Sequence, residues 1–476
     1  MRFVLIAMAV LAFAACRQEI VEEQFEPLDT YDRYRDALER LDLIDSVMGS
    51  AWDEAGRRAL NSPTSVEAPI EEVLYFDPHH PDAVGYRFPL RRGRRVVIEI
   101  ETETARYFAD LYRVADDDAG DEAPVLVASR SEGAGRIELE ARRDRFYVLR
   151  VQPELLRGGR FRIRITTEAS LAFPVQDTGP ESILSFYGDS RGGGTRIHEG
   201  VDIFAPRGTP LLAASDAVVY RVGERDRGGN IVSLRDEERD LLLYYAHLDE
   251  QLVTQGQRVS AGDVIGTVGN TGNAIHTPPH LHIGVYQGGW RNAVDPWEYI
   301  VDPPVTDPSP PDLENRIGEW FLLASDSTME RAVPPPIVPP RYVNRNPFLY
   351  APGTAAVSEL GLRETPTPEP ATTVLPAETA VQVVGSSSDH VRVRTLPGET
   401  WLVTADMLVP AEESRTLPGG TVVRDSLSGD IITELADDSS VTVLGTATIP
   451  RVEAASNPGH VTVVSLDSGR IGVVTP

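Results

Sequence analysis

The sequence predicts a mainly β, multidomain protein, in which an antiparallel β-sheet core is preceded by a helix and a small β-sandwich and followed by small β-barrels. Two observations support this prediction. Short apolar runs that alternate with charged residues, separated by glycine-rich turns, recur through most of the chain, as is typical of antiparallel strands. The length of 476 residues corresponds to several domains, and a hydrophobic content of 41% excludes disorder throughout the chain.

The chain is strongly acidic. Its 45 basic residues are all arginine, and against 72 acidic residues they give a formal net charge of −27. Because binding to phosphate backbones requires a basic face, a nucleic-acid partner is not expected. We interpret the acidity as a solubility or salt adaptation, with an acidic functional surface as the alternative.

Residues 1–15 are predicted to form a signal peptide. One positive charge precedes an unbroken apolar run, Phe3 to Ala15, which is shorter than the roughly 20 residues that span a bilayer. The run ends in Phe13-Ala14-Ala15-Cys16, which resembles the lipobox of bacterial lipoproteins. The resemblance implies a membrane anchor through a lipid on Cys16, with the acidic residues 16–29 as a tether. Ordinary cleavage after Ala14, which would leave a free thiol, is the alternative.

Residues 30–64 are predicted to be helical and residues 65–170 to form a β-sandwich. Apolar residues recur at steps of three or four from Thr30 to Leu60, which indicates one amphipathic helix that ends before Pro63. The following segment changes to short runs of alternating apolar and charged residues. Its succession of tyrosine- and arginine-containing strands loosely resembles the pre-peptidase C-terminal β-sandwich family.

Residues 171–300 contain five of the nine histidines, and four of these lie in three short motifs. The first motif is His198-Glu199-Gly200-Val201-Asp202. If a strand runs from Glu199 to Phe204, the spacing of four places His198 and Asp202 on one face, because side-chain direction repeats every two residues. In the last motif, His280-Leu281-His282, the two histidines share a face in the same way. Between them, His247 ends an apolar run.

Two histidines and one aspartate can provide three ligands for Zn²⁺ and leave a fourth position open, which is the catalytic arrangement. The only cysteine, Cys16, lies outside this region, so a thiolate-based site and an intramolecular disulfide are both excluded. Further histidines near a zinc ion are suited to transferring protons near neutral pH or to stabilising an oxyanion.

The three motifs together resemble the lysostaphin-like (LytM-type) zinc metallopeptidases that cut peptidoglycan peptides. The resemblance implies that residues 171–300 form an antiparallel metallopeptidase domain with one zinc ion per chain. By position it implies His198, Asp202 and His282 as zinc ligands and His247 and His280 as catalytic histidines. Tyr187 is a weaker candidate for stabilising the oxyanion, and His276 is expected to be a loop residue without a ligand role.

The rest of the chain is predicted to be a linker followed by two small barrels. Residues 301–349 are rich in proline, which favours a stiff extended spacer, and a short ordered element is expected within it at residues 317–323. Residues 350–411 and 412–476 each contain a valine-rich run followed by a polar turn and another β-like run. They resemble tandem bacterial Src-homology-3-like barrels, which implies contacts with the cell wall or with regulatory proteins.

The expected function is that of a zinc metalloendopeptidase, which hydrolyses peptide bonds in stem or cross-bridge peptides of peptidoglycan. The expected location is the cell envelope, as a secreted lipoprotein whose membrane anchor faces the periplasm. A non-catalytic activator or scaffold of other wall hydrolases is the alternative, although such relatives have typically lost ligands and none is missing here. A wall adaptor that only binds through the C-terminal barrels is a third possibility.

Overall fold

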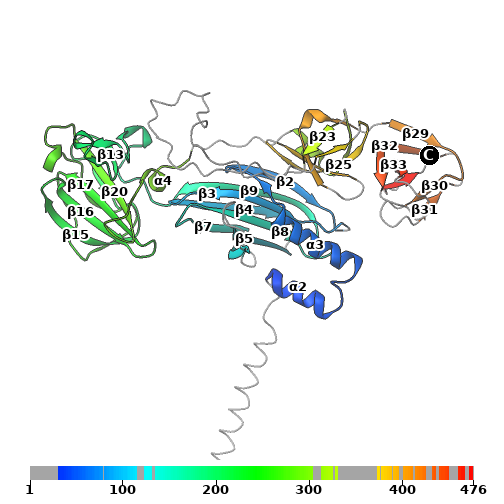
Figure 1. Ribbon diagram of the computed structural model, residues 1–476, viewed down its shortest axis with the longest axis horizontal. Coiled ribbons are helices and arrows are strands. Elements are labelled where there is room, and N and C mark those ends of the chain that lie inside the picture. The colour runs from blue at the N-terminus through cyan, green and yellow to red at the C-terminus, as the bar shows by residue number, and fades with distance from the viewer. Residues whose placement is uncertain are drawn as a thin grey trace, which may run out of the picture.

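Strands in several mostly antiparallel sheets dominate the structure, which confirms the predicted mainly β, multidomain fold class. In this computed structural model, a sheet that contains the histidine motifs, a sandwich and the C-terminal sheets follow one another along the long axis (Figure 1). The structure describes residues 30–78, 80–104, 106–114, 123–130, 135–303, 312–324, 327–330, 372–375, 377–388, 390–395, 400–410, 413–424, 431–435, 439–449, 459–466 and 471–474.

The predicted signal peptide, tether and lipidation site at Cys16 lie outside the described residues. Within the described residues, none of the helices combines the length and the apolar character needed to cross a bilayer.

The prediction of one helix from Thr30 to Leu60 is wrong, because the structure has two, α2 (Tyr31–Arg40) and α3 (Val47–Asn61). Asp42 adopts a left-handed φ of 55° immediately after the first helix, which a continuing helix does not allow. Ser46 then caps the second helix, since its Oγ accepts a hydrogen bond from the Gly49 amide at 3.0 Å.

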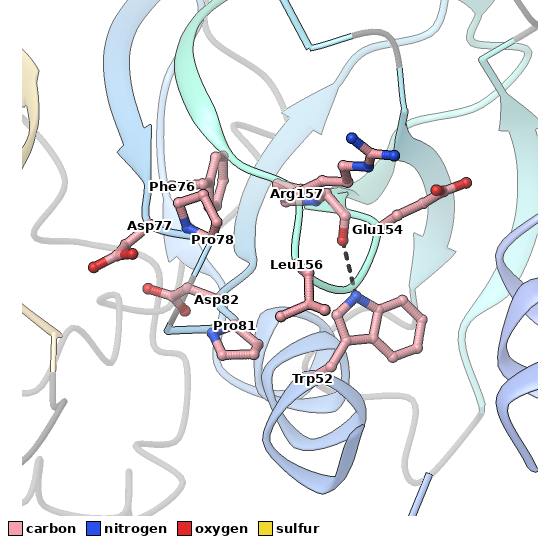
Figure 2. Close-up of a pocket in the computed structure, with 10 residues that line it drawn as sticks. Trp52, Phe76, Asp77, Pro78, Pro81, Asp82, Glu154, Leu156 and Arg157 are labelled. Atoms are coloured by element: carbon pink, nitrogen blue, oxygen red, sulfur yellow. Dashed lines mark hydrogen bonds between the residues drawn. The ribbon is translucent and has the colours of Figure 1, made fainter. Parts of the chain in front are cut away.

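Trp52 attaches the helices to the sandwich. Its side chain is 1% exposed and its indole Nε1 donates to the Pro153 carbonyl at 2.8 Å, the bond drawn in Figure 2. The Tyr31 ring stacks on the indole at 4.9 Å between centroids. The apolar face of residues 30–61 therefore packs on the sandwich through buried aromatic side chains.

The sandwich consists of two facing sheets whose apolar side chains form one core. The strand order of the first sheet is β1-β3-β8-β5-β6, and that of the second ends in β2-β9-β4-β7. The bounds in the first sheet are β1 Thr64–Ser65, β3 Val84–Leu90, β5 Tyr107–Val114, β6 Val125–Ser129 and β8 Arg145–Pro153. Those in the second are β2 Ile70–Phe76, β4 Arg94–Thr102, β7 Arg136–Glu140 and β9 Gly159–Ala169.

The histidine motifs lie on a twisted eight-stranded sheet of order β10-β13-β20-β17-β16-β15-β18, with β21 paired to β20. One face of this sheet packs on its own hydrophobic core. The bounds are β10 Ile183–Ser185, β13 Val201–Phe204, β15 Ala217–Arg225, β16 Gly229–Asp236, β17 Leu241–Leu248, β18 Arg258–Val259, β20 His280–Gln287 and β21 Ala293–Val294. Two short antiparallel pairs accompany it, β11 (Ser190–Arg191) with β12 (Arg196–Ile197) and β14 (Pro210–Leu212) with β19 (Val264–Thr267).

An ion-pair network joins this sheet to the sandwich near the short helix α4 (Trp297–Ile300). Buried Glu298 accepts hydrogen bonds from Arg94 at 2.7 Å and from Arg91 at 2.9 Å. A second set of contacts involves the end of β20, where Gln287 donates to the Arg142 carbonyl at 3.0 Å. These contacts lie at the opposite end of β20 from His280 and His282, so the sandwich docks away from the histidines.

The first C-terminal sheet is not a separate barrel, because it continues the second sheet of the sandwich. Strand β25 pairs with β2 in antiparallel register, with Leu74 opposite Gly385. Across this junction Arg392 donates to both carboxylate oxygens of Glu72, at 3.0 and 3.2 Å, and Glu72 is 1% exposed. The bounds are β22 Trp320–Leu323, β25 Ala380–Ser387, β26 Val391–Thr395, β27 Thr400–Val403 and β28 Leu408–Pro410.

The boundaries predicted for this region therefore differ from the structure. Strand β22 falls inside the predicted linker 301–349, yet it pairs with both β25 and β28 and buries Phe321 and Leu323. Strand β22 lies within residues 317–323, where the sequence predicted a short ordered element inside the linker. A further pair, β23 (Ser327–Glu330) with β24 (Thr372–Leu375), also begins before residue 350.

The last described strands form a six-stranded sheet of order β29-β32-β33-β34-β30-β31. The bounds are β29 Glu413–Leu417, β30 Val422–Arg424, β31 Ile431–Glu434, β32 Ser439–Ile449, β33 Gly459–Ser465 and β34 Ile471–Val474. This range coincides with the second predicted barrel, although several of its connecting residues lie outside the described part of the chain.

Candidate metal centre

Adjacent strands place a carboxylate and an imidazole directly opposite each other. Asp202 on β13 and His282 on β20 are partners in the antiparallel ladder. Their strand neighbours Ile203, Leu281 and Ile283 are fully buried in the core beneath the sheet. Because side chains alternate along a strand, Asp202 and His282 share the outer face.

His198 reaches the same place from a loop. The strand expected from Glu199 begins only at Val201. Strand alternation therefore does not explain why His198 and Asp202 lie on the same face. His198 Nε2 nevertheless lies 2.9 Å from His282 Nδ1 and 3.1 Å from Asp202 Oδ1. Gly200 makes this approach possible, because a Cβ there would lie 2.7 Å from Cε1 of His282.

The three residues fit a zinc ion. With Asp202 Oδ1 3.0 Å from His282 Nδ1, the three candidate ligand atoms form a nearly equilateral triangle. Ligand atoms at about 2.0–2.1 Å from one tetrahedral zinc lie about 3.3 Å apart, so a small outward adjustment accommodates the ion. Two imidazoles and one carboxylate are a ligand set that zinc accepts, with a fourth position left for water or substrate.

The protonation states favour metal binding. Burial alone raises the pKa of Asp202, but hydrogen bonds with His198 and His282 outweigh it and hold the pKa well below the usual range. Burial lowers the pKa of His282 despite the opposing charge of Asp202. At neutral pH the cluster therefore presents a carboxylate and a neutral imidazole, the forms that ligate a metal.

The structure brings His247 and His280 to the same face. Their ring centroids are 5.1 Å apart, and the His247 ring lies 6.1 Å from that of His282. Each ring directs Nδ1 to a backbone carbonyl at 2.9 Å, Thr271 for His247 and Pro278 for His280. With Nδ1 as the donor, Nε2 of each imidazole remains as the nitrogen that can exchange a proton with a ligand.

His247 depends on an unusual backbone conformation. Strand alternation along β17 would direct it toward the core, since Tyr245 is completely buried and Ala246 is the register partner of His282. His247 has a φ of 69°, beside an irregular register between β16 and β17, and this turns it out of the alternation. Burial lowers its pKa to about 4, so the imidazole is neutral and able to accept a proton at neutral pH.

Arg191 is a residue of the site that the sequence motifs did not reveal. Its Nη2 donates to Asp202 Oδ2 at 3.1 Å, lies 3.0 Å from His198 Nδ1 and contacts Ser185 Oγ. It comes from the β11–β12 hairpin, whose turn contains Gly193 and Gly194 at positive φ. An arginine seven residues before His198, directly ahead of the glycine run 192–194, was the available signal.

Replacing Arg191 with glutamine is expected to weaken zinc binding about 10–100-fold, the effect typical of losing a group that orients metal ligands. The substitution removes the charge beside Asp202 and the donor that fixes its second oxygen. Chelator competition on the purified chain measures the affinity. Arg196→Gln, on the exposed partner strand, is the control, and equal zinc affinity in both variants would contradict the expectation.

Two further candidates, Tyr187 and His276, are outside the group of three converging ligand atoms. The Tyr187 hydroxyl donates to the Ala293 carbonyl at 3.0 Å, which ties it to β21. His276 is exposed in the loop before β20. It is not in the metal-ligand group found among the described residues, which consists of His198, Asp202 and His282.

Comparisons with known proteins agree with this geometry. Residues 196–296 match the model of peptidase family M23, so this part of the chain is an M23 (LytM-type) peptidase domain. Over 139 residues the chain is 39% identical to the L-Ala–D-Glu endopeptidase of Bacillus subtilis, covering 27% of this chain and 42% of that protein. Over 90 residues it is 42% identical to the peptidoglycan DD-endopeptidase ShyC of Vibrio cholerae, covering 19% and 20%.

Among solved structures, the catalytic domain of lysostaphin from Staphylococcus simulans is 33% identical, with 24% of this chain and 87% of that chain covered and a TM-score of 0.23. The chain spans less than half the length of the two curated relatives. The similarity therefore concerns the M23 domain, while the sandwich and C-terminal sheets lie outside the matched family range.

Proposed function

We propose that this protein is a zinc-dependent endopeptidase that hydrolyses peptide bonds in stem or cross-bridge peptides of peptidoglycan. The observation that carries the proposal is the convergence of His198 Nε2, Asp202 Oδ1 and His282 Nδ1 on one point, next to two further imidazoles. The endopeptidase names of the relatives, one of which specifies peptidoglycan, support the substrate class.

His198, Asp202 and His282 would hold the zinc. When bound, a zinc ion supplies a Lewis acid that polarises a carbonyl and lowers the pKa of water. His247 and His280 then provide the proton transfers, since each holds Nδ1 on a carbonyl and keeps Nε2 free for exchange. The ring-to-ring distance of 5.1 Å allows one imidazole to accept a proton while the other stabilises developing negative charge.

The test is digestion of defined muropeptides with the purified full chain, with the new termini identified by mass spectrometry. We expect peptide-bond cleavage by protein that contains one zinc per chain, loss of cleavage on chelation, and recovery when zinc is returned. Full activity of metal-free protein would overturn the zinc mechanism. A zinc-loaded chain that cleaves none of the muropeptides would overturn the enzymatic proposal and favour a scaffold or activator.

We also propose that the protein acts at the cell envelope, held at a membrane by a lipid on Cys16. The apolar run and Cys16 of the leader support this proposal. Contacts of the last C-terminal sheet with the wall or with regulatory proteins are part of the same proposal, supported by the resemblance of residues 412–476 to modules attached to wall enzymes.

A further inference from the structure

A chain of aromatic rings extends from the metal cluster across the outer face of the M23 sheet. The Tyr244 ring lies 6.1 Å from His282, and Trp290 lies 5.9 Å from Tyr244. Trp290 also contacts Tyr286 at 5.1 Å and Tyr220 at 6.3 Å between centroids. We call Tyr220, Tyr244, Tyr286 and Trp290 the aromatic platform.

Local structure explains why these rings gather. Tyr244 points outward from β17 because its neighbours Leu243 and Tyr245 are fully buried, and its partner on β20 is Gly284, which has no side chain to occupy this face. Tyr220 lies at the irregular register of β15. Trp290 follows Gly288 and Gly289, whose positive φ values of 68° and 144° form the β20–β21 turn.

One ring of the platform is buried and holds its neighbour in place, while two other rings are exposed to solvent. Tyr286 is only 7% exposed and packs against the Trp290 indole, which fixes the indole in place. Trp290 is 42% exposed and Tyr220 is 47% exposed, so two adjacent ring systems face solvent. Adjacent exposed aromatic rings held by packing are characteristic of a binding surface, whereas single exposed apolar residues are not.

Polar groups border the rings. Although burial raises the pKa of Tyr244, Arg221 and Arg225 act on it electrostatically in the opposite direction, which places positive charge beside the platform. Burial raises the pKa of Tyr286, and the negative charge of Glu199 raises it further, which places an acidic group beside the same rings. The surface thus combines flat apolar faces with hydrogen-bonding groups at its edge, which suits a ligand that is apolar on its face and polar around its rim.

We infer that the aromatic platform binds an N-acetylated sugar ring of the glycan strand while the attached peptide enters the metal site. This inference rests on the proposed function. The stem-peptide residues are small or charged and offer no large flat face, whereas a pyranose ring presents a C–H face with hydroxyl and acetamido groups around it. Two successive ring contacts separate Trp290 from His282 by at most about 12 Å, the reach of three to four extended residues.

The test compares two substrates that differ only in the sugar: a disaccharide-linked stem peptide and the same peptide released from its sugar. For the zinc-loaded full chain we expect kcat/KM to be about tenfold higher with the sugar-linked peptide, a factor that corresponds to one good aromatic contact. Trp290→Ala is expected to abolish this preference and to leave kcat/KM for the free peptide within about twofold. Leu252→Ala, a comparably exposed apolar side chain of the same domain, is the control and keeps the preference.

A binding measurement separates this inference from the proposed function. Calorimetric titration of the full chain with the free disaccharide is expected to saturate for the wild type and the Leu252→Ala variant but not for Trp290→Ala. Hydrolysis of both substrates at equal kcat/KM, without disaccharide binding, would overturn the inference and leave the endopeptidase proposal intact. Disaccharide binding without hydrolysis of either substrate would support the sugar site and overturn the enzyme. A wild-type dimer that Trp290→Ala dissociates would assign the platform to self-association and overturn the inference.

Discussion

Substitution of His282 with alanine is expected to abolish both zinc binding and hydrolysis. The loss of activity should far exceed the factor of about 10–100 that is typical when a residue beyond the ligands is removed. His282 Nδ1 is the atom that faces both other ligands, at 2.9 Å from His198 Nε2 and 3.0 Å from Asp202 Oδ1. Without it only two ligands remain, fewer than the three that catalytic zinc sites use.

Metal analysis and kcat/KM of the purified His282→Ala variant measure this prediction. His276→Ala is the matched control, since it removes an exposed histidine from the adjacent loop and is expected to keep zinc and activity. A folded His282→Ala protein that retains one zinc per chain would show that the metal is held by other residues.

Removal of the His247 imidazole is expected to leave zinc content unchanged and to lower kcat by about 10²–10⁴-fold, the range of general acid–base catalysis. His247 contacts the cluster through its ring, 6.1 Å from the His282 ring, and its Nδ1 bonds to the Thr271 carbonyl. It therefore lies beside the three ligands and is not one of the converging group.

The backbone at His247 calls for two variants. Alanine at a φ of 69° adds strain, whereas asparagine tolerates the left-handed region, so His247→Asn separates the loss of the imidazole from a backbone effect. We expect both variants to keep zinc and lose turnover. Loss of zinc from His247→Asn, or wild-type kcat in either variant, would refute the assigned role.

Period-two alternation was sufficient to predict the outward direction of Asp202, His280 and His282, because each belongs to a regular strand with buried neighbours. It was not sufficient for His198, which lies in a loop, or for His247, whose left-handed φ reverses the direction that alternation gives. Single-residue conformations of this kind leave no periodic signal in the sequence.

Long-range register was equally inaccessible. Leu74 and Gly385 are partners in one ladder although more than 300 residues separate them, and nothing in either local pattern specifies that pairing. For the same reason a barrel boundary at residue 350 was expected, while β22 in fact supplies a strand to that sheet from inside the proline-rich segment. Arg191 was missed because its contacts arise from hairpin geometry and not from a motif.

The continuous ladder between β2 and β25 also has a mechanical consequence. The chain enters and leaves the M23 domain at neighbouring points, where the Leu171 amide bonds to the Tyr299 carbonyl and the Ala169 amide to the Asp302 side chain. The sandwich and the first C-terminal sheet are joined directly, by backbone pairing and by the buried pair of Glu72 and Arg392. Tension between the N-terminal helices and the C-terminal sheets is therefore carried by that junction and bypasses the ladder that aligns Asp202 with His282.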